Sequence, residues 1–231
     1  MLRHIFHAGV LCFNLYSIWF DQKHVDLPFP DTINDANFFF KARLIFLTQW
    51  CFLLQTFYYA VALTNDVIGS NKPHPKNPPI IRRAKDMLFI LAFPLAAYVA
   101  STFWTIYAID RELIFPSVFD SIFPSWLNHS MHTYILFFII IELVTSFRKY
   151  PSQFVGHSLT SGFMIVYIFW INIIYFKYSI WVYPVLEVMN WAGRILFYIF
   201  STSIIVVFYI LGEIMNARYW AKEIGNRKKI K

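Results

Sequence analysis

Long apolar runs with almost no Asp, Glu, Lys or Arg dominate the pattern along this 231-residue chain. A bilayer-spanning helix needs roughly 17 to 25 apolar residues. Backbone groups in lipid must also bond within their own segment, which favours helices. The pattern therefore predicts an all-α, polytopic membrane protein that forms a single transmembrane domain, residues 1–231. Its six expected transmembrane helices cover residues 5–20, 44–64, 87–109, 126–147, 159–176 and 195–212.

The first run, residues 5–20, is also compatible with a signal peptide, because Arg3 precedes it. The residues that follow, DQKHVDLPFP, lack the small-residue pattern of a cleavage site. We therefore interpret this run as a first span that is retained in the protein.

Composition and charge add an orientation to this picture. Hydrophobic residues make up 58% of the chain and charged residues 14%, whereas soluble domains carry about 25% charged residues. Fourteen of the 20 Lys and Arg residues lie in the N-terminus, the second loop, the fourth loop and the C-terminal tail. The positive-inside rule then places both termini in the cytosol, with residues 65–86 as a Pro-rich basic cytosolic loop and 217–231 as a basic cytosolic tail.

The net charge of +7 is explained by this orientation and by contact with anionic membrane lipids, so no nucleic-acid partner is expected. The chain ends in KKIK, with lysines at the third and fourth positions from the end. This pattern resembles a dilysine retrieval signal, although an ordinary basic tail would look the same. It favours the endoplasmic reticulum membrane over the plasma membrane.

Two polar side chains are expected at the same depth in the membrane. His132 lies six residues into the fourth span, about 9 Å deep at 1.5 Å per residue. Thr48 lies five residues beyond Arg43 in the second span, about 7.5 Å deep and from the same side. An imidazole that removes the hydroxyl proton makes a threonine nucleophilic. The pair is therefore a candidate catalytic site if spans two and four are neighbours.

Other interpretations of these residues remain open. Threonine in a span commonly bonds its own helix backbone, and an intramembrane histidine often links two helices. His129 and His132, three residues apart, share a helix face and supply two possible metal ligands, which Asp110, Glu112 or Asp120 would complete. Because no second His or Cys cluster follows, we expect neither a resident metal nor a cofactor.

Four sequence blocks resemble the androgen-induced gene 1 and androgen-dependent TFPI-regulating protein family. The resemblance extends from about residue 43 to residue 216, and its most specific parts are the asparagine–histidine block and the YAIDRE block. The four blocks are FWTIYAIDRELIFP (103–116), PSWLNHSMHT (124–133), WVYPVLE (181–187) and LGE (211–213).

The resemblance implies a six-span threonine hydrolase that cleaves fatty acid esters of hydroxy fatty acids. The family histidine corresponds to His132, and the family threonine corresponds to Thr48 in FLT. Asn128, His129 and Arg111 are then candidates for binding a polar head group or stabilising an oxyanion. The expected partners are a lipid ester substrate and membrane lipids. The main alternative is a non-enzymatic lipid-binding or transport protein of the membrane.

Overall fold

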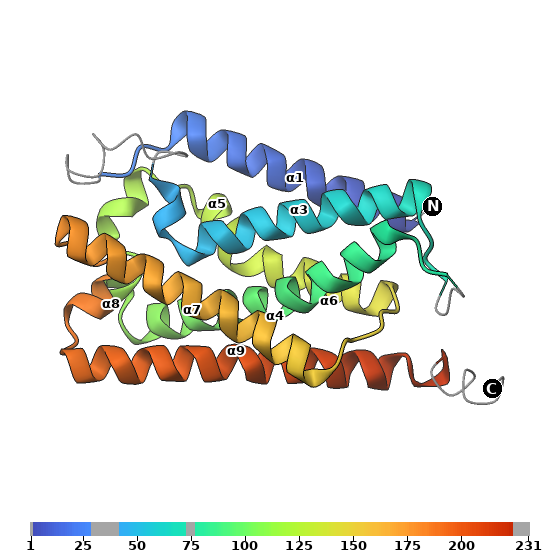
Figure 1. Cartoon of the computed structure of the whole chain (residues 1–231). Coiled ribbons are helices and arrows are strands. Elements are labelled where there is room, and N and C mark those ends of the chain that lie inside the picture. The colour runs from blue at the N-terminus through green and yellow to red at the C-terminus, as the bar shows by residue number, and fades with distance from the viewer. Residues whose placement is uncertain (1, 29–41, 73–76, 224–231) are drawn as a thin grey trace.

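The computed structural model describes residues 2–28, 42–72 and 77–223 of the chain, and within them every regular element is helical. The long helices run side by side along one axis and form a bundle (Figure 1). Five of them are continuous helices: α1 Leu2–His24, α3 Leu47–Ile68, α4 Ile80–Ile109, α7 Gln153–Tyr178 and α9 Trp191–Tyr219. The sixth has three parts: α5 Ser125–His129, the π-helical turn η4 Ser130–Tyr134 and α6 Ile135–Thr145. Short helices connect them: η1 Arg43–Ile45, η2 Arg111–Leu113, η3 Ser117–Ser121 and α8 Pro184–Glu187.

The all-helical prediction is confirmed for the described residues, and each expected span overlaps one long helical segment. Four segments, Ile80–Ile109, Ser125–Thr145, Gln153–Tyr178 and Trp191–Tyr219, are long and apolar enough to cross a membrane. The count of six spans stays a prediction. The start of α1 and the end of α9 lie at the same end of the bundle (Figure 1), and their cytosolic placement also stays a prediction.

The basic segment 65–86 is more helical than the sequence suggested. α3 extends to Ile68 and α4 already begins at Ile80, so Arg82 and Lys85 lie on a helix and not in a linker. Both side chains are buried, because they turn inward to the carboxylates of Asp86 and Glu142. The KKIK motif lies outside the described residues.

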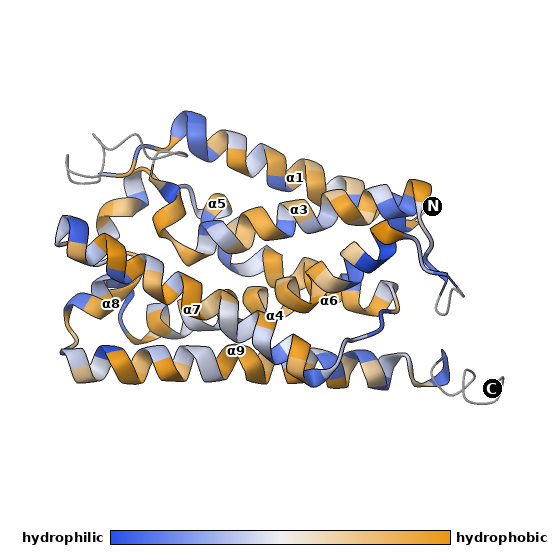
Figure 2. Ribbon diagram, in the orientation of Figure 1, coloured by the Kyte–Doolittle hydropathy of each residue, from blue (hydrophilic) through white to orange (hydrophobic). Residues whose placement is uncertain are grey.

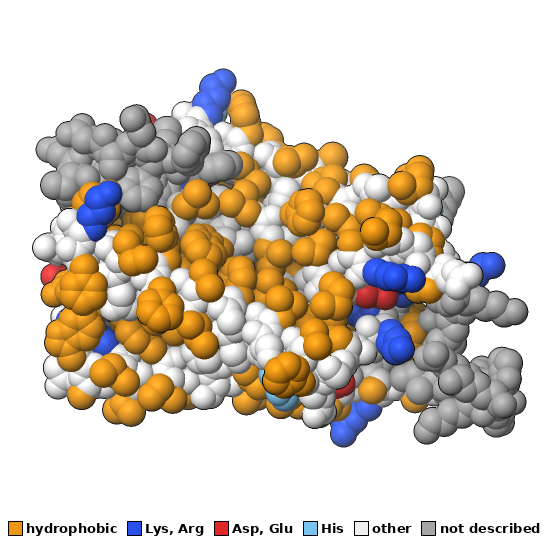
Figure 3. Space-filling model, viewed as in Figure 1, with side chains coloured by type: hydrophobic (Ala, Val, Ile, Leu, Met, Phe, Trp, Pro, Cys, Tyr) orange, Lys and Arg blue, Asp and Glu red, His pale blue; other side chains and the backbone are white. Residues whose placement is uncertain are grey.

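Apolar side chains cover the visible middle of the bundle, while charged side chains gather toward its two ends (Figures 2 and 3). α4 is the central helix: 67% of its most apolar window is buried inside the protein, compared with 22% for α9. An exposed apolar face on α9 has no stabilising contact in water, but it matches the hydrocarbon of a bilayer. This distribution supports a multi-pass membrane protein.

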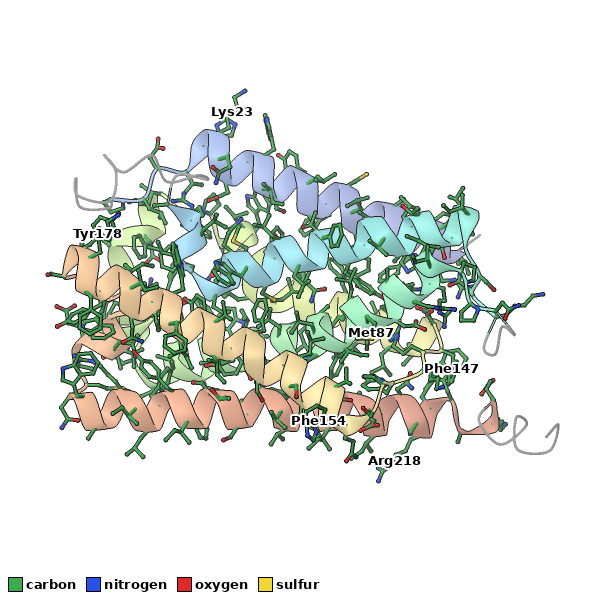
Figure 4. All side chains as sticks on the ribbon, in the orientation of Figure 1. Lys23, Met87, Phe147, Phe154, Tyr178 and Arg218 are labelled. Carbon is green, nitrogen blue, oxygen red and sulfur yellow. The ribbon has the colours of Figure 1, made fainter. Side chains whose placement is uncertain are left out.

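Glycines allow the outer helices to approach closely. A Cβ on Gly156 of α7 would collide with the Tyr209 ring of α9, and a Cβ on Gly212 of α9 would come within 2.7 Å of Phe93. Small residues at such crossings let side chains of the neighbouring helix pack tightly. Figure 4 shows that side chains fill the space between the ribbons, while Lys23 and Arg218 point away from the bundle.

A buried charge cluster joins four helices near the end of the bundle where α1 starts. Its centre is Glu142 of α6, which is fully buried. Its carboxylate oxygens lie 2.7 Å from His7 Nε2, 3.0 Å from Lys85 Nζ and 3.0 Å from Arg148 Nη2. The Tyr58 hydroxyl donates to the same carboxylate at 2.8 Å. The cluster therefore ties α1, α3 and α4 to α6 at the end opposite the start of α3.

Candidate active site

The start of α3 presents Thr48 in the first turn of a 22-residue helix. The chain enters this turn through Ala42, whose φ of 61° is left-handed, and then through the extended residue Phe46. The first N–H groups of a helix have no acceptor within it. Side chains of other elements therefore have to satisfy and hold this segment.

Two tyrosines hold the backbone just before Thr48. The N–H of Leu47 donates to the hydroxyls of Tyr167 and Tyr183, at 2.9 Å each. The Tyr167 hydroxyl also donates to the carbonyl of Ile45 at 2.9 Å, and the two hydroxyls lie 3.0 Å apart. Tyr167 comes from α7 and Tyr183 immediately precedes α8. Spans that are distant in sequence thus fix the position of the Thr48 backbone.

His132 lies in the π-helical turn η4, which separates α5 from α6. A single π turn inside an α-helix shifts the side chains that follow it and is frequently found at functional sites. The turn keeps His132 buried, with 7% of its surface exposed. It also places Asn128, one turn earlier, beside the imidazole.

Thr48 and His132 lie within hydrogen-bond distance, with Thr48 Oγ1 3.1 Å from His132 Nε2. The other ring nitrogen, Nδ1, lies 3.0 Å from the backbone carbonyl of Asn128 and 2.7 Å from Asn128 Oδ1. A backbone carbonyl can only accept, so Nδ1 carries the proton of the neutral ring. Nε2 is then the acceptor, and the Thr48 hydroxyl donates to it.

The imidazole is also held by an aromatic ring. Phe103 of α4 stacks on His132 with ring centroids 3.6 Å apart and an interplanar angle of 13°. This stacking leaves the ring few alternative orientations, and it places a carbon surface instead of water against one face. Helices α4 and α5–α6 together fix the plane, the tautomer and the depth of the base.

A cavity of about 150 Å³ opens beside the pair. Thr48 and His132 both line it, and most of the remaining wall is apolar. The aromatic side chains of this wall come from several elements and include Phe103, Phe115, Phe119, Phe123, Tyr183 and Phe197. The arrangement can bring a hydroxyl and a base against a bound hydrocarbon-rich molecule, as nucleophilic catalysis requires.

Comparison with known proteins places the chain in a family. The sequence model of the FAR-17a/AIG1-like protein family matches residues 2–217. The chain belongs to this family. It is 35% identical to the human androgen-induced gene 1 protein over 211 residues, covering 88% of this chain and 86% of that protein.

Two further relatives give the same result. The human androgen-dependent TFPI-regulating protein is 37% identical over 191 residues, which cover 82% of this chain and 83% of the relative. The Mesocricetus auratus protein of the same name is 32% identical over 226 residues, or 94% of this chain and 97% of the relative. No solved structure matches the chain.

The other candidate residues of this FAR-17a/AIG1-like protein are placed differently from Thr48 and His132. Asn128 contacts the imidazole, but it is not among the described residues that line the cavity. Arg111 also lies away from the cavity wall and pairs with Asp120 at 2.6 Å. The hydrogen bond to Asp120 raises the pKa of the Arg111 guanidinium above its ordinary value. Neither residue is therefore among the described residues that line the cavity with Thr48.

The two histidines of the fourth helical segment face different neighbours. His129 Nδ1 lies 3.0 Å from Thr133 Oγ1, and its ring stacks on Trp104 at 5.3 Å between centroids. His132 faces Thr48 instead. In the described parts of the chain, no group of three His, Cys, Asp or Glu side chains is placed to hold a metal ion.

Sequence reasoning named Asn128 as a candidate for head-group or oxyanion binding, but it did not predict that Asn128 orients the His132 imidazole. Asp110 and Glu112 had been considered for a site around the histidines, but Asp110 caps η2 through the N–H of Glu112. Asn128 takes the orienting position. Its four-residue spacing from His132 was the available signal, because residues i and i+4 lie on the same helix face.

For the threonine hydrolase chemistry that the family resemblance implies, we expect Asn128→Ala to lower kcat about ten- to a hundredfold with little change in KM. The loss is smaller than the roughly 10²- to 10⁴-fold contribution of a general base, because the Asn128 backbone carbonyl still accepts from Nδ1. Asn128→Asp keeps a side-chain acceptor and should retain more activity than Asn128→Ala. Steady-state kinetics of both variants measure the effect, and an unchanged kcat in Asn128→Ala would show that the side chain does not orient the base.

Proposed function

We propose that this protein is an intramembrane lipid esterase that hydrolyses fatty acid esters of hydroxy fatty acids. The proposal depends chiefly on one observation, the 3.1 Å contact between Thr48 Oγ1 and His132 Nε2 at the wall of a mostly apolar cavity. The resemblance of Thr48 and His132 to the family's threonine and histidine supports the same assignment. No metal or cofactor is needed for this chemistry.

The reaction has two steps. The Thr48 oxygen attacks the ester carbonyl carbon while His132 Nε2 takes the hydroxyl proton. The tetrahedral intermediate collapses, and the leaving hydroxy fatty acid takes that proton as its C–O bond breaks. The acyl group remains on Thr48 as an ester. Water then attacks this ester, with His132 again accepting a proton, and the fatty acid leaves while Thr48 regains its hydrogen.

The wall of the cavity supports a substrate with a hydrocarbon chain next to its ester group. Its wall is mostly aromatic and aliphatic, and polar side chains are a minority at its surface. Apolar surface removed from contact with water contributes about 25 cal/mol per Å². An ester with an apolar acyl chain therefore binds in this cavity more favourably than a more polar ester of similar size.

The membrane setting is part of the proposal. The substrate is itself a lipid and reaches Thr48 from the bilayer, so the enzyme acts as a multi-pass protein of the endoplasmic reticulum membrane. Both termini are proposed to face the cytosol.

We expect detergent-purified wild-type protein to cleave an ester of a long-chain hydroxy fatty acid, with release of both acids detected by mass spectrometry. A short-chain ester of an alcohol should be cleaved more slowly, since it fills less of the apolar cavity. A protein that binds the long-chain ester but releases no acid would contradict the esterase proposal. That result would favour the alternative of a lipid-binding or transport protein, which needs no bond cleavage.

A further inference from the structure

Gln49 is an unusual buried residue beside the candidate nucleophile. It directly follows Thr48 in the first turn of α3, and 3% of its surface is exposed. Its side-chain nitrogen Nε2 is buried and has no hydrogen-bond partner among the described residues. Gln49 also lines the cavity together with Thr48 and His132.

An unpaired buried amide donor destabilises a fold, because it has lost its bonds to water without replacement. Most buried polar groups in native proteins have partners, and a catalytic role is one explanation for an exception. A polar donor that is unsatisfied in the resting protein and lines the reaction cavity therefore indicates an acceptor that is present only during function.

Gln55, on the same helix, shows what a structural glutamine does in this bundle. It is buried to a similar degree, with 1% of its surface exposed. Its Nε2 donates to the carbonyl of Ala92 at 2.8 Å and links α3 to α4. It is not among the residues that line the cavity. Gln49 has the same chemistry and similar burial, but its donor has no such acceptor.

The position of Gln49 also suits an anion electrostatically. The first turn of a helix carries a partial positive charge from its aligned peptide dipoles. α3 begins at Leu47, so Thr48 and Gln49 both lie in this turn. Negative charge that develops on a carbonyl oxygen next to Thr48 forms at the favourable end of the helix dipole.

We propose that Gln49 Nε2 donates a hydrogen bond to the oxyanion that forms when Thr48 attacks the ester carbonyl. This inference depends on the proposed function. As the bond from Thr48 Oγ1 to the carbonyl carbon forms, the carbonyl π electrons move to its oxygen, which becomes the acceptor that Nε2 lacks. When the intermediate collapses, those electrons re-form the carbonyl and the hydrogen bond weakens. Gln49 is thus a catalytic residue that acts mainly in the transition state, as amide side chains do in other oxyanion holes.

The decisive variant is Gln49→Leu, which removes the donor and keeps a side chain of similar size. We expect kcat to fall about 10²- to 10³-fold, the usual effect of removing one oxyanion donor. KM should change little, because the bond forms chiefly in the transition state. The matched control is Gln55→Leu, which should leave kcat within a fewfold of wild type while lowering the thermal midpoint.

Stability supplies a second readout that separates catalysis from structure. Gln49→Leu replaces an unpaired buried amide with an apolar side chain, so its thermal midpoint should stay the same or rise by a few degrees. A trifluoromethyl ketone with a long alkyl chain, which adds to Thr48 and forms an oxyanion, should bind less tightly by about the factor lost in kcat. The affinity for the fatty acid product should be unchanged.

Each result supports or overturns the inference. If wild type is active and Gln49→Leu keeps kcat within about threefold, Gln49 is not the oxyanion donor. A fall in kcat together with a fall in thermal midpoint and unchanged ketone affinity would assign Gln49 a structural role and overturn the inference as well. An inert wild type would instead overturn the proposed function itself, so the two failures are distinguishable.

Discussion

Thr48→Ala and His132→Ala should each lower ester hydrolysis by at least about 10³-fold, while the proteins fold and purify as wild type. Removing either member of a nucleophile–base pair eliminates most of the chemistry that the pair performs as a unit. Thr48 Oγ1 and His132 Nε2 lie 3.1 Å apart, so the proposed proton transfer from the hydroxyl to the imidazole requires both side chains. The double variant should therefore lose no more activity than either single variant. Measurements of kcat/KM on a long-chain ester test this expectation.

The chain supplies a matched control for each residue. Thr56 lies on the same helix as Thr48, but its hydroxyl donates to the Phe52 carbonyl at 2.8 Å. His129 lies three residues before His132 and contacts Thr133 and Trp104 instead of Thr48. Thr56→Ala and His129→Ala should retain kcat within a fewfold. Full activity in Thr48→Ala would contradict the proposed mechanism, and so would equal losses in all four variants.

Glu142→Ala should produce a large loss of stability, about 3–5 kcal/mol in the free energy of unfolding. The Glu142 carboxylate is fully buried and is the shared partner of Lys85, Arg148 and His7. Its removal leaves buried positive groups without their counter-charge, which costs more than the original pair contributed. Denaturation of the detergent-solubilised protein measures the change.

The control for Glu142 is an ion pair at the surface. Asp120 pairs with Arg111 at 2.6 Å, and both side chains are partly exposed to solvent. Exposed pairs contribute about 0–1 kcal/mol, so Asp120→Ala should change stability by no more than that amount. If Glu142→Ala and Asp120→Ala had similar small effects, the buried cluster would not be what fastens these four helices together.

The sequence predicted the helical class and the helix positions because apolar runs report directly on burial in lipid. It also predicted that Thr48 and His132 lie at a similar level along their helices, because that level follows from counting residues along a helix. Whether the two helices are adjacent in the bundle does not follow from counting residues. Packing decides it, and the structure brings α3 and η4 into contact.

Other features depended on interactions that no local pattern encodes. The π-helical turn at Ser130–Tyr134, which contains His132, has no distinct sequence signal. Lys85 was predicted to lie in a basic loop, because the local sequence does not indicate that its partner is the buried carboxylate of Glu142. Gln49 is one glutamine among several in the sequence, and only the structure shows that its buried donor is unpaired and that the residue lines the cavity.

The most direct test of the account is to locate the nucleophile chemically. Wild-type protein is treated with a fluorophosphonate that carries a long alkyl chain, and the modified peptide is identified by mass spectrometry. We expect one covalent adduct on Thr48, slower labelling in His132→Ala and none in Thr48→Ala. An adduct on a different residue, or undiminished labelling of Thr48→Ala, would contradict the assignment of Thr48 as the nucleophile.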